Sequence, residues 1–546
     1  MGRHNSASMR SWRFISSIGL MLLSACTGGP DSETPSPTPT LQETIFHGDM
    51  IYESVDGGAY FARGVHAFRI DPNGGDIGCL MVGTPTIECH YDGVPEHLHM
   101  KSSSTQYYSK YVRERIYEVQ GISSAGEQGI QVTFTMQYLY TYTDGSTSKR
   151  IYTGTGTLSP VEQFEEADSK GLRLLGEYGD FSSPAARYAP QHVEMPGEEQ
   201  TEGKFASTSN FSVNVRVHGD YAYLVRLGDG LRILNIADPK HVFEVSHHAP
   251  DDVGAWYYND VKLMEQGERL YALVADSTIG MLVYDVTQPE SSFLVSTFFP
   301  GLVDSEDGLN NHTLAVVGTT AYMANYEGSL TLDPEGNGGS GGLIMVDLSN
   351  PSSPQELGRW LTRDAGGTFT HDLFVKDSRA YLASWEAGLV VLDVARPSEP
   401  SIVGRFTYDR MTSHSVWVAE VGGRLIAAHG DEDYYSHLRM VDVDPNSSDY
   451  MQEIGSLMLR PQVSIHNVMI QGEEVIAAHY QDGVRIFNIS DPTKPALSAW
   501  FNTWESVLSA ENGRSFYEGA CGVDVVGNRI YVADISRGLL ILERTP

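Results

Sequence analysis

The stretch Gly388-Leu-Val-Val-Leu-Asp-Val394 decides the fold, because close copies of it recur along the chain. Its apolar run is short, contains β-branched residues and ends in an acid before a proline turn, which is typical of a buried β-strand. An alternating strand and a glycine-containing turn precede each copy. The copies begin at Gly230, Gly280, Gly342, Gly388, Leu438, Gly483 and Gly538. Internal repetition is therefore the organising feature of residues from about 211 to the C-terminus.

Each repeat contains four short strands. A first strand and a second strand lead to the apolar third strand, and a fourth follows the proline turn, as in Ile402-Val-Gly-Arg-Phe406. The first strands recur every 43 to 59 residues, which is the spacing of β-propeller blades. A single blade cannot bury both of its faces, so blades must pack against one another. The sequence predicts an all-β fold with a seven-bladed propeller.

The two ends of the repeat region are offset. The seventh copy stops at Pro546, directly after its third strand, so its fourth strand is missing. A strand with the matching pattern, Leu172-Arg-Leu-Leu-Gly-Glu-Tyr178, comes before the first copy. We predict that this N-terminal strand completes the last blade and closes the ring, which also removes an open sheet edge.

The third strands carry a family resemblance. Gly388-Leu-Val-Val-Leu-Asp-Val394 resembles the consensus of the LVIVD repeat family, and the resemblance extends over roughly residues 170–546 because the pattern recurs in register. It implies a propeller domain, which we place at residues 166–546. The chain as a whole resembles an LVIVD repeat-containing bacterial lipoprotein.

Residues 44–165 lie outside the repeat. Alternating segments such as Gln131-Val-Thr-Phe-Thr-Met-Gln-Tyr138, with a hairpin turn at Thr143-Asp-Gly-Ser146, predict a small β-rich domain. Cys79 and Cys89 lie ten residues apart in a turn-rich stretch. In an oxidising compartment we expect these two cysteines to form a disulfide.

The N-terminus has the features of an export signal. The apolar run that follows Arg3, Arg10 and Arg13 is too short to span a bilayer. The sequence Leu23-Ser-Ala-Cys26 resembles a bacterial lipobox, which implies cleavage after residue 25 and lipidation of Cys26. An ordinary cleaved signal with a chance cysteine is the alternative. Residues 26–43 are a predicted flexible linker. This predicts a location in the cell envelope, on the outer membrane in a Gram-negative host.

The charge of the chain is strongly negative, with a formal net charge of −33. Removing three signal arginines from 37 basic residues leaves 34 against 70 acidic ones, a net charge of −36. Such an excess disfavours nucleic acid as a partner. The membrane, reached through the lipid anchor, is the predicted partner together with an unidentified protein, glycan or small molecule.

Histidines recur at equivalent places in the repeats. The first strand, which lines the central channel in a propeller, begins with a histidine in four consecutive copies and with Cys521 in the seventh. The end of the second strand is a further recurring place, taken by Asp276, Asn325, Ser384, His429, His479 and Asp534 in copies two to seven. His437 replaces the usual glycine before the third strand of copy five. Antiparallel pairing brings these places to one mouth of the channel.

Two interpretations of this pattern stay open. Imidazoles on separate rigid strands can hold a transition-metal cofactor, with a thiolate as a softer ligand. The candidate metal residues are His312, His371, His414, His466, His429, His479 and Cys521. Alternatively, the rings point between the blades and form structural hydrogen bonds, as buried polar groups require. The spacing does not show where the rings converge.

Two functions follow from these interpretations. The first is a surface-displayed binding or interaction module without catalytic activity. The second is a metal-dependent enzyme at the His-rich mouth, with redox chemistry as one option, and it is similar to selenium-binding proteins, which resemble propellers with histidine-lined metal sites. The chain contains no nucleophile elbow, phosphate-binding loop or HExxH motif. Catalytic residues are therefore not predicted.

Overall fold

A computed structural model describes about seven tenths of the chain and divides it into two compact units. One contains residues 1–164 and 509–515, and the other contains residues 165–508 and 516–546. The described residues are 44–54, 62–70, 79–81, 86–90, 94–107, 111–125, 129–142, 145–160, 169–179, 212–249, 258–277, 279–299, 309–326, 342–367, 370–409, 411–433, 436–460, 463–503, 519–535 and 537–545. They form strands and three short 3-10 helices, and none of them belongs to an α-helix. No helix of sufficient length and hydrophobicity to cross a membrane occurs among them.

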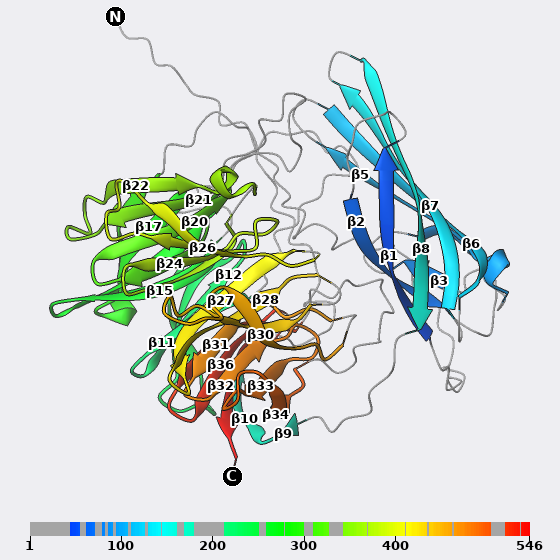
Figure 1. Ribbon diagram of the computed structural model, residues 1–546. Coiled ribbons are helices and arrows are strands. Elements are labelled where there is room, and N and C mark those ends of the chain that lie inside the picture. The colour runs from blue at the N-terminus through cyan, green and yellow to red at the C-terminus, as the bar shows by residue number, and fades with distance from the viewer. Residues whose placement is uncertain are drawn as a thin grey trace, which may run out of the picture. The chain divides into compact units, whose positions relative to one another are not determined.

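The first unit is an eight-stranded antiparallel sheet in the order β3-β2-β1-β8-β7-β6-β5-β4 (Figure 1). Its elements are β1 (Thr44–Ser54), β2 (Ala62–Ile70), β3 (Cys79–Met81), β4 (Thr86–His90), η1 (Pro95–His97), β5 (His99–Tyr107), β6 (Tyr111–Ala125), β7 (Gly129–Tyr142) and β8 (Thr147–Pro160). Alternate residues of β7, including Val132 and Phe134, are buried in its core. The β-rich character predicted for this segment is thus observed.

The second unit is built from seven antiparallel sheets, six of four strands and one of five, formed by its described residues. The first three sheets consist of β11 (Ser212–His218), β12 (Tyr221–Arg226), β13 (Gly230–Asn235) and β14 (Phe243–His248); of β15 (Tyr258–Gln266), β16 (Arg269–Asp276), β17 (Gly280–Asp285) and β18 (Phe293–Phe298); and of β19 (Leu309–Val317), β20 (Thr320–Tyr326), β21 (Gly342–Asp347) and β22 (Gln355–Leu361). The fourth and fifth sheets consist of β23 (Asp372–Lys376), β24 (Arg379–Ala383), β25 (Leu389–Asp393) and β26 (Ser401–Phe406), and of β27 (Ser413–Val421), β28 (Arg424–Asp431), β29 (Leu438–Asp442) and β30 (Gln452–Leu457). The sixth sheet consists of β31 (Val468–Gln471), β32 (Glu474–Ala478), β33 (Val484–Asn488), β34 (Ala496–Phe501) and β9 (Ser169–Lys170). The seventh contains β35 (Ala520–Val526), β36 (Arg529–Asp534), β37 (Gly538–Arg544) and β10 (Leu172–Tyr178). The 3-10 helices η3 (Pro289–Ser291) and η4 (Thr362–Ala365) lie in connections.

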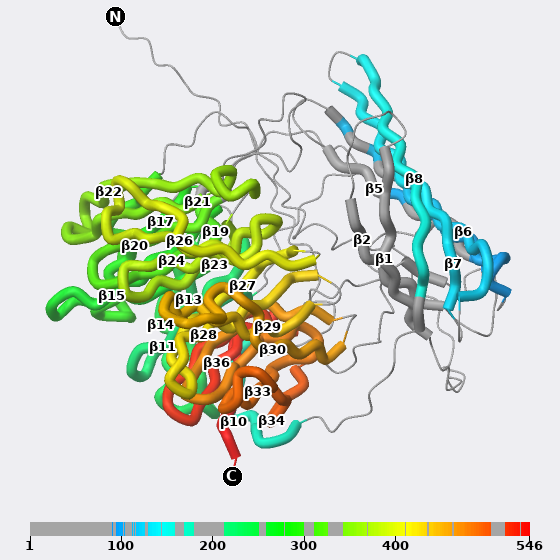
Figure 2. Tube along the Cα trace, viewed as in Figure 1, coloured from blue at the N-terminus to red at the C-terminus, as the bar shows by residue number. Residues whose placement is uncertain are grey.

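In all seven sheets the strands pair in the order first, second, third, fourth. This is the strand arrangement of β-propeller blades. The first strand of each sheet contacts the first strand of the next, and β35 contacts β11. The strand expected at Leu172–Tyr178 is β10, and it pairs with β37 although their sequence positions differ by more than 360 residues. Figure 2 shows β10 beside the red C-terminal strand.

The third strands form the buried centre of the sheets. Leu389 to Leu392 on β25 are all fully buried, as expected for a strand that is covered on both faces. Burying each such side chain stabilises the fold by roughly 1.5–3 kcal/mol. The glycine before the strand has a structural reason, because Gly388 has a φ of 77° and a Cβ there would lie 2.3 Å from the carbonyl oxygen of Phe406. Only glycine meets both demands.

Polar side chains near the axis join neighbouring sheets. The buried Asp260 carboxylate on β15 accepts hydrogen bonds from the Leu314 amide of the next sheet and from the Asn214 side chain of the preceding one. Asp372 accepts a hydrogen bond from the Val416 amide in the same way. Because these carboxylates bond to backbone of an adjacent sheet, they fix the register between first strands.

Two predictions concern three cysteines whose side chains are not described. Cys26 lies in the undescribed N-terminal segment, and only the backbone of Cys79 and Cys89 is described, in β3 and β4. Lipidation of Cys26 and the Cys79–Cys89 disulfide therefore stay predictions. Among the described side chains, Cys521 is a buried free thiol.

Candidate metal centre

The first-strand residues at the axis lie at irregularities of β-pairing. Ser413 and Ser415 both pair with β28, and His414 between them is an extra residue. Asn259 and Cys521 are the extra residues at the equivalent place in the β15–β16 and β35–β36 pairs. A β-bulge removes its extra residue from the ladder and re-aims the side chain. The bulge therefore breaks the alternation that would have turned His414 between blades.

Four of the predicted histidines form a continuous row. The ring centroids of His312 and His371 are 3.9 Å apart, and those of His371 and His414 are also 3.9 Å apart. The rings of His414 and His466 follow at 4.4 Å. Cys521 Sγ extends the row, at 3.4 Å from Nδ1 and 3.8 Å from Nε2 of His466. Five of the seven predicted metal residues are thus neighbours.

Two of the Nδ1 atoms in the row, those of His414 and His466, are held by backbone. His414 Nδ1 donates to the carbonyl oxygen of His466 at 2.9 Å, and His466 Nδ1 donates to the carbonyl oxygen of Cys521 at 2.6 Å. A carbonyl can only accept, so the proton of each neutral ring resides on Nδ1. The Nε2 atom then carries a lone pair. Metal-binding histidines adopt this Nδ1–H tautomer when Nδ1–H is bonded to a carbonyl.

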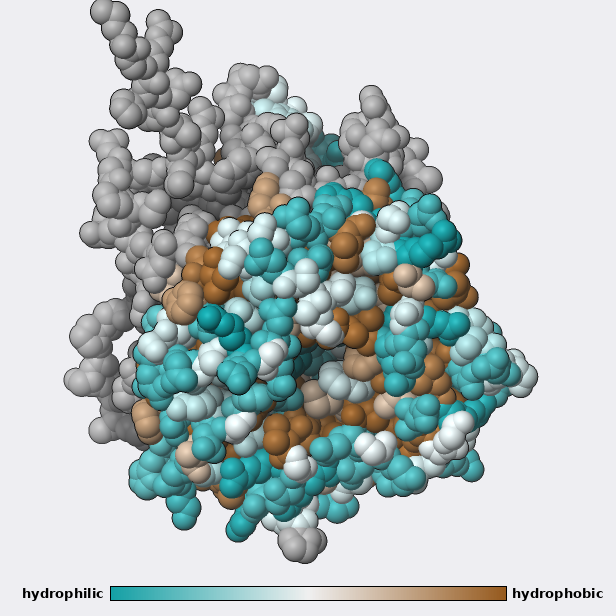
Figure 3. Space-filling model, turned by 90° about the vertical axis from the view of Figure 1, so that its left-hand side faces the viewer, coloured by the Kyte–Doolittle hydropathy of each residue, from teal (hydrophilic) through white to brown (hydrophobic). Residues whose placement is uncertain are grey.

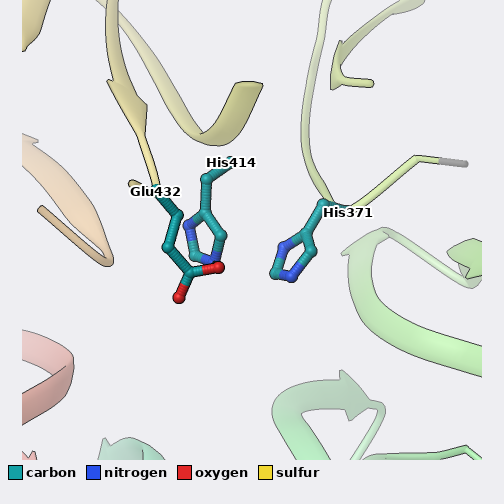
Figure 4. A group of neighbouring side chains, drawn as sticks. All are labelled: His371, His414 and Glu432. Atoms are coloured by element: carbon teal, nitrogen blue, oxygen red, sulfur yellow. The ribbon is translucent and has the colours of Figure 1, made fainter. Parts of the chain in front are cut away.

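A carboxylate completes the group. One ligand atom from each of His371, His414 and Glu432 lies within 4.8 Å of the other two, and all three residues are buried. Figure 4 shows the two rings and the carboxylate directed into the same space. His371 directly precedes β23, His414 lies on β27 and Glu432 directly follows β28, so two neighbouring sheets supply the set. Adjacent donor atoms around one zinc ion are about 3–3.5 Å apart, so small side-chain movements would close the set.

Two buried atoms of this group lack hydrogen-bond partners. His414 Nε2 and Glu432 Oε2 lie 3.5 Å apart, and neither forms a hydrogen bond. The other carboxylate oxygen, Oε1, accepts a hydrogen bond from Tyr480 Oη. An unsatisfied buried polar atom costs roughly 1–3 kcal/mol, so such atoms call for an explanation. A shared cation would satisfy both at once.

The site favours neutral imidazoles. Burial, reinforced by neighbouring histidines, holds the pKa of His371 and that of His414 well below the usual 6.5. Burial also lowers the pKa of His466 to about 4.

The pKa of Glu432 is raised by burial to about 8, against the opposing hydrogen bond from Tyr480. Burial raises the pKa of the Cys521 thiol well above 9. At neutral pH the rings are in their metal-binding form, whereas Glu432 and Cys521 must release protons to bind a metal.

Aromatic side chains flank the group on a strained backbone. Trp385 and Tyr480 have φ values of 42° and 40°, in the left-handed region that bulky residues rarely adopt. The Trp385 ring stacks on His371 at 5.4 Å, and the Tyr480 ring lies 4.8 Å from that of His466. Strained backbone of this kind clusters at functional sites.

His429 and His479 lie apart from the group of three. His429 Nδ1 donates to the carbonyl oxygen of Ser415 at 2.9 Å, and its Nε2 is 3.1 Å from Tyr408 Oη. His479 Nδ1 lies 3.5 Å from Asp482, which also pairs with Arg460. His437 is a half-buried residue of the connection before β29. The contacts of His429 fit the structural alternative, whereas His479 Nδ1 forms no hydrogen bond with a described residue and lies outside the group of three.

Pairing registers correct one equivalence assumed from the sequence. His429 pairs with Val416, whereas Val468, the counterpart of Val416, pairs with Ala477. The counterpart of His429 is therefore Ala477, and Asp431 occupies the end of the second strand, where it pairs with Ser413. Histidine thus replaces the usual residue there only in the sixth sheet, not in the fifth. The mistake arose because the string Ile-Ala-Ala-His occurs in both repeats, two positions out of register.

Sequence reasoning missed Glu432. This residue follows Asp431 directly, as Trp385 follows Ser384 and Tyr480 follows His479. Three consecutive sheets thus place a large side chain just beyond the second strand. The available signal was the acidic run Asp431-Glu-Asp433 in a connection that is longer than those of the neighbouring repeats.

One face of the molecule is recessed, and the exposure of the axial row varies along its length. Figure 3 shows a face that mixes hydrophilic and hydrophobic patches and is recessed near its middle. Trp385 is partly exposed, and the side chain of His466 is 14% exposed, whereas that of His414 is 1% exposed. The row is therefore closed off at His414 and reaches solvent near His466.

Comparison with known proteins supports the repeat. The LVIVD repeat model matches residues 212–248, 338–362, 367–408 and 519–543, within the first, third, fourth and seventh repeats. No curated protein matches the chain.

Solved propellers are among the structural matches. The β-propeller domain of Cps50 (Swd1) from Myceliophteria thermophila has a TM-score of 0.41 and 14% identity over 62% of this chain and 97% of its own. Sqt1 from Saccharomyces cerevisiae has a TM-score of 0.41 and 12% identity over 62% and 97%. BamB from Moraxella catarrhalis has a TM-score of 0.35 and 12% identity over 61% and 85%. On its sheet topology and its family matches, this chain contains LVIVD-type repeats arranged as the blades of a β-propeller.

Proposed function

We propose that this chain is a metal-binding β-propeller of the cell envelope, and that His371, His414 and Glu432 hold a transition-metal ion at its axis. The observation that carries the proposal is the pair of unsatisfied buried atoms, His414 Nε2 and Glu432 Oε2, which face each other at 3.5 Å. Buried polar atoms usually have hydrogen-bond partners, and one cation between these two atoms would satisfy both.

The ligand set favours a reactive site. Two histidines and one carboxylate leave coordination positions open, as in catalytic zinc sites and non-haem iron sites. Closed structural sites use four protein ligands instead. A metal held in this way would supply Lewis acidity or redox chemistry, so the metal-dependent enzyme is the favoured activity. The backbone carbonyl of His466 fixes the tautomer of His414, and burial excludes water from the group.

The blade arrangement supports the complete architecture that we propose, a seven-bladed ring closed by β10. The β10–β37 pairing and the contact between β35 and β11 both support closure. A closed ring gives the metal group rigid surroundings, because every ligand strand is flanked by neighbours on both sides.

The lipobox supports anchoring of the propeller to a membrane through Cys26. The linker of residues 26–43 would hold the folded units off the surface. Replacement of Cys26 by Ser should move the protein from the membrane fraction to the soluble fraction of the envelope. Retention of the variant in the membrane fraction would contradict lipid anchoring.

An interaction module is the second candidate function. Its support is the repeat propeller fold itself, which commonly presents loops and a channel mouth to a ligand. It predicts that a protein, glycan or small molecule is captured by a metal-free variant as well as by the parent.

Metal analysis tests the main proposal. The parent, purified without a histidine tag and dialysed against Zn²⁺ and then metal-free buffer, should retain at least one equivalent. The double variant His371→Ala, His414→Ala should lose it. The control His241→Ala removes a histidine whose side chain is 81% exposed and should retain as much zinc as the parent. A parent without zinc after this treatment would overturn the proposal.

A further inference from the structure

Glu432 is contacted by a strained turn of the sixth sheet. Tyr480, in the turn between β32 and β33, donates a hydrogen bond from Oη to Glu432 Oε1. The φ of Tyr480 is 40°, in the left-handed region that bulky residues rarely adopt. Such a conformation persists only where surrounding contacts hold it. The contacts of this turn therefore decide where the Tyr480 hydroxyl lies.

Asp482 is the charged side chain of the turn Tyr480-Gln-Asp-Gly483. Its carboxylate is fully buried, and Oδ1 lies 3.2 Å from Arg460 Nη1 and 3.7 Å from Arg485 Nη2. Oδ2 lies 3.5 Å from His479 Nδ1. Neither oxygen has a hydrogen-bond partner among the described residues, so charge attraction is what these contacts supply. Burial strengthens this attraction, because water does not screen it.

Arg460 is the partner of Asp482 that comes from another segment of the chain. Arg485 lies on β33, next to the turn, and its Nη1 also donates to Asn502 Oδ1 at 2.9 Å. Arg460 lies in the connection between β30 and β31, and its side chain is 10% exposed. The Arg460–Asp482 ion pair thus ties the turn of the sixth sheet to the connection that leads from the fifth.

The same connection contacts the loop that carries Glu432. Ser464 Oγ accepts a hydrogen bond at 3.2 Å from the amide of Asp433, the residue directly after Glu432. The neighbouring Ile465 amide donates to Ser436 Oγ, in the same loop, at 3.0 Å. Both serines are buried. This connection is therefore fixed against both the loop and the turn, whose side chains form the hydrogen bond to the carboxylate.

We propose that Arg460 and Asp482 are positioning residues of the axial metal site. Their ion pair holds the turn in the conformation that presents the Tyr480 hydroxyl to Glu432, and this contact keeps the other carboxylate oxygen directed at the metal. Neither residue is one of the three ligands, so both act through Tyr480. The effect on the metal rests on the proposed function, whereas the position of the Tyr480 hydroxyl is a property of the metal-free protein and can be measured separately.

Fluorine NMR of the full-length, metal-free protein tests the position of Tyr480. With 3-fluorotyrosine in place of Tyr480 alone, Arg460→Gln should shift the fluorine resonance, and Arg460→Lys, which keeps the charge, should restore it. Arg460→Met, an apolar side chain suited to burial, should give the same shift as Arg460→Gln. The control Arg269→Gln removes an arginine paired with the buried Asp285 of the second sheet and should leave the resonance unmoved. A resonance that neither Arg460→Gln nor Arg460→Met moves would overturn the inference.

Zinc titration tests whether the ion pair acts through Tyr480. Arg460→Gln should lower Zn²⁺ affinity about 10-fold, as expected for groups that orient a ligand. In a Tyr480→Phe background the same substitution should lower the affinity less than about twofold, because the effects of coupled residues are not additive. Equal losses in both backgrounds would overturn the inference and leave the metal site intact. A parent that binds no zinc would instead overturn the proposed function, while the fluorine resonance still decides the position of Tyr480.

Discussion

Two sets of histidines in the propeller unit behave differently although their residues are chemically identical. In the axial row, His414 uses Nδ1 for a backbone bond to the next sheet and leaves Nε2 unsatisfied. In the fifth sheet, both nitrogens of His429 contact groups close to it, a carbonyl and a tyrosine hydroxyl. The difference comes from backbone geometry, because a bulge directs His414 to the axis while His429 stays in the regular ladder. A count of histidines therefore does not identify a metal site, whereas ligand atoms of three residues that lie close to one another indicate one.

The largest expected effect on Zn²⁺ affinity comes from removing the carboxylate of the axial group. Glu432→Gln keeps the shape but removes the negative charge, so Zn²⁺ affinity should fall by more than about 100-fold, since even outer-shell changes cost 10–100-fold. The matched control is Asp433→Asn, in the same acidic run, which should retain the parent affinity. Competition titration with a chromophoric chelator measures both. Equal affinities for Glu432→Gln and the parent would show that the carboxylate is not a ligand.

The second prediction concerns the pH dependence of stability that His429 causes. Burial lowers its pKa to about 3, so the folded state keeps it neutral while the unfolded state, with a pKa near 6.5, takes up a proton. His429 therefore leaves the free energy of unfolding unchanged above pH 6.5, and this free energy decreases as the pH falls from 6.5 toward 3. Between pH 6.5 and 5 the parent should lose about 2 kcal/mol more than His429→Gln does.

Urea unfolding of the metal-free proteins at both pH values measures this difference. Zn²⁺ binding by His429→Gln should equal that of the parent. Identical pH dependence in the two proteins, or loss of zinc from the variant, would place His429 with the axial set instead.

The smallest effect concerns Tyr480, which touches both the row and the carboxylate. Tyr480→Phe removes the hydrogen bond to Glu432 Oε1 but keeps the ring that packs against His466. Zn²⁺ affinity should fall about 10-fold, the lower end of the range for groups that orient a ligand. Tyr408→Phe, which removes a hydroxyl beside His429, is the control and should leave zinc affinity unchanged. Equal affinities in all three proteins would show that Tyr480 does not orient Glu432.

Much of the fold could be predicted from the sequence because it follows from a repeated local pattern. The apolar third strands and their glycines recur in register, and the strand pattern at Leu172–Tyr178 indicated β10 with the bounds that the structure has. These features depend on periodicity and turn chemistry, which a sequence carries directly.

The site was only partly predictable for physical reasons. The row of histidines is visible as a recurring position, but its direction depends on a bulge, which is a feature of pairing between strands. The identical Ile-Ala-Ala-His strings concealed a two-residue register difference between the fifth and sixth sheets. Glu432 lies in the connection after β28, at a place where the neighbouring sheets carry Trp385 and Tyr480, so no recurring residue type marks it.

The most direct test of the account is a crystal structure of the zinc-loaded protein with anomalous diffraction data collected at the zinc absorption edge. The account predicts an anomalous peak at about 2.0–2.2 Å from a nitrogen of His371, from His414 Nε2 and from a carboxylate oxygen of Glu432. Zinc found only at surface histidines such as His241, with the axial rings unchanged and no peak between them, would contradict it.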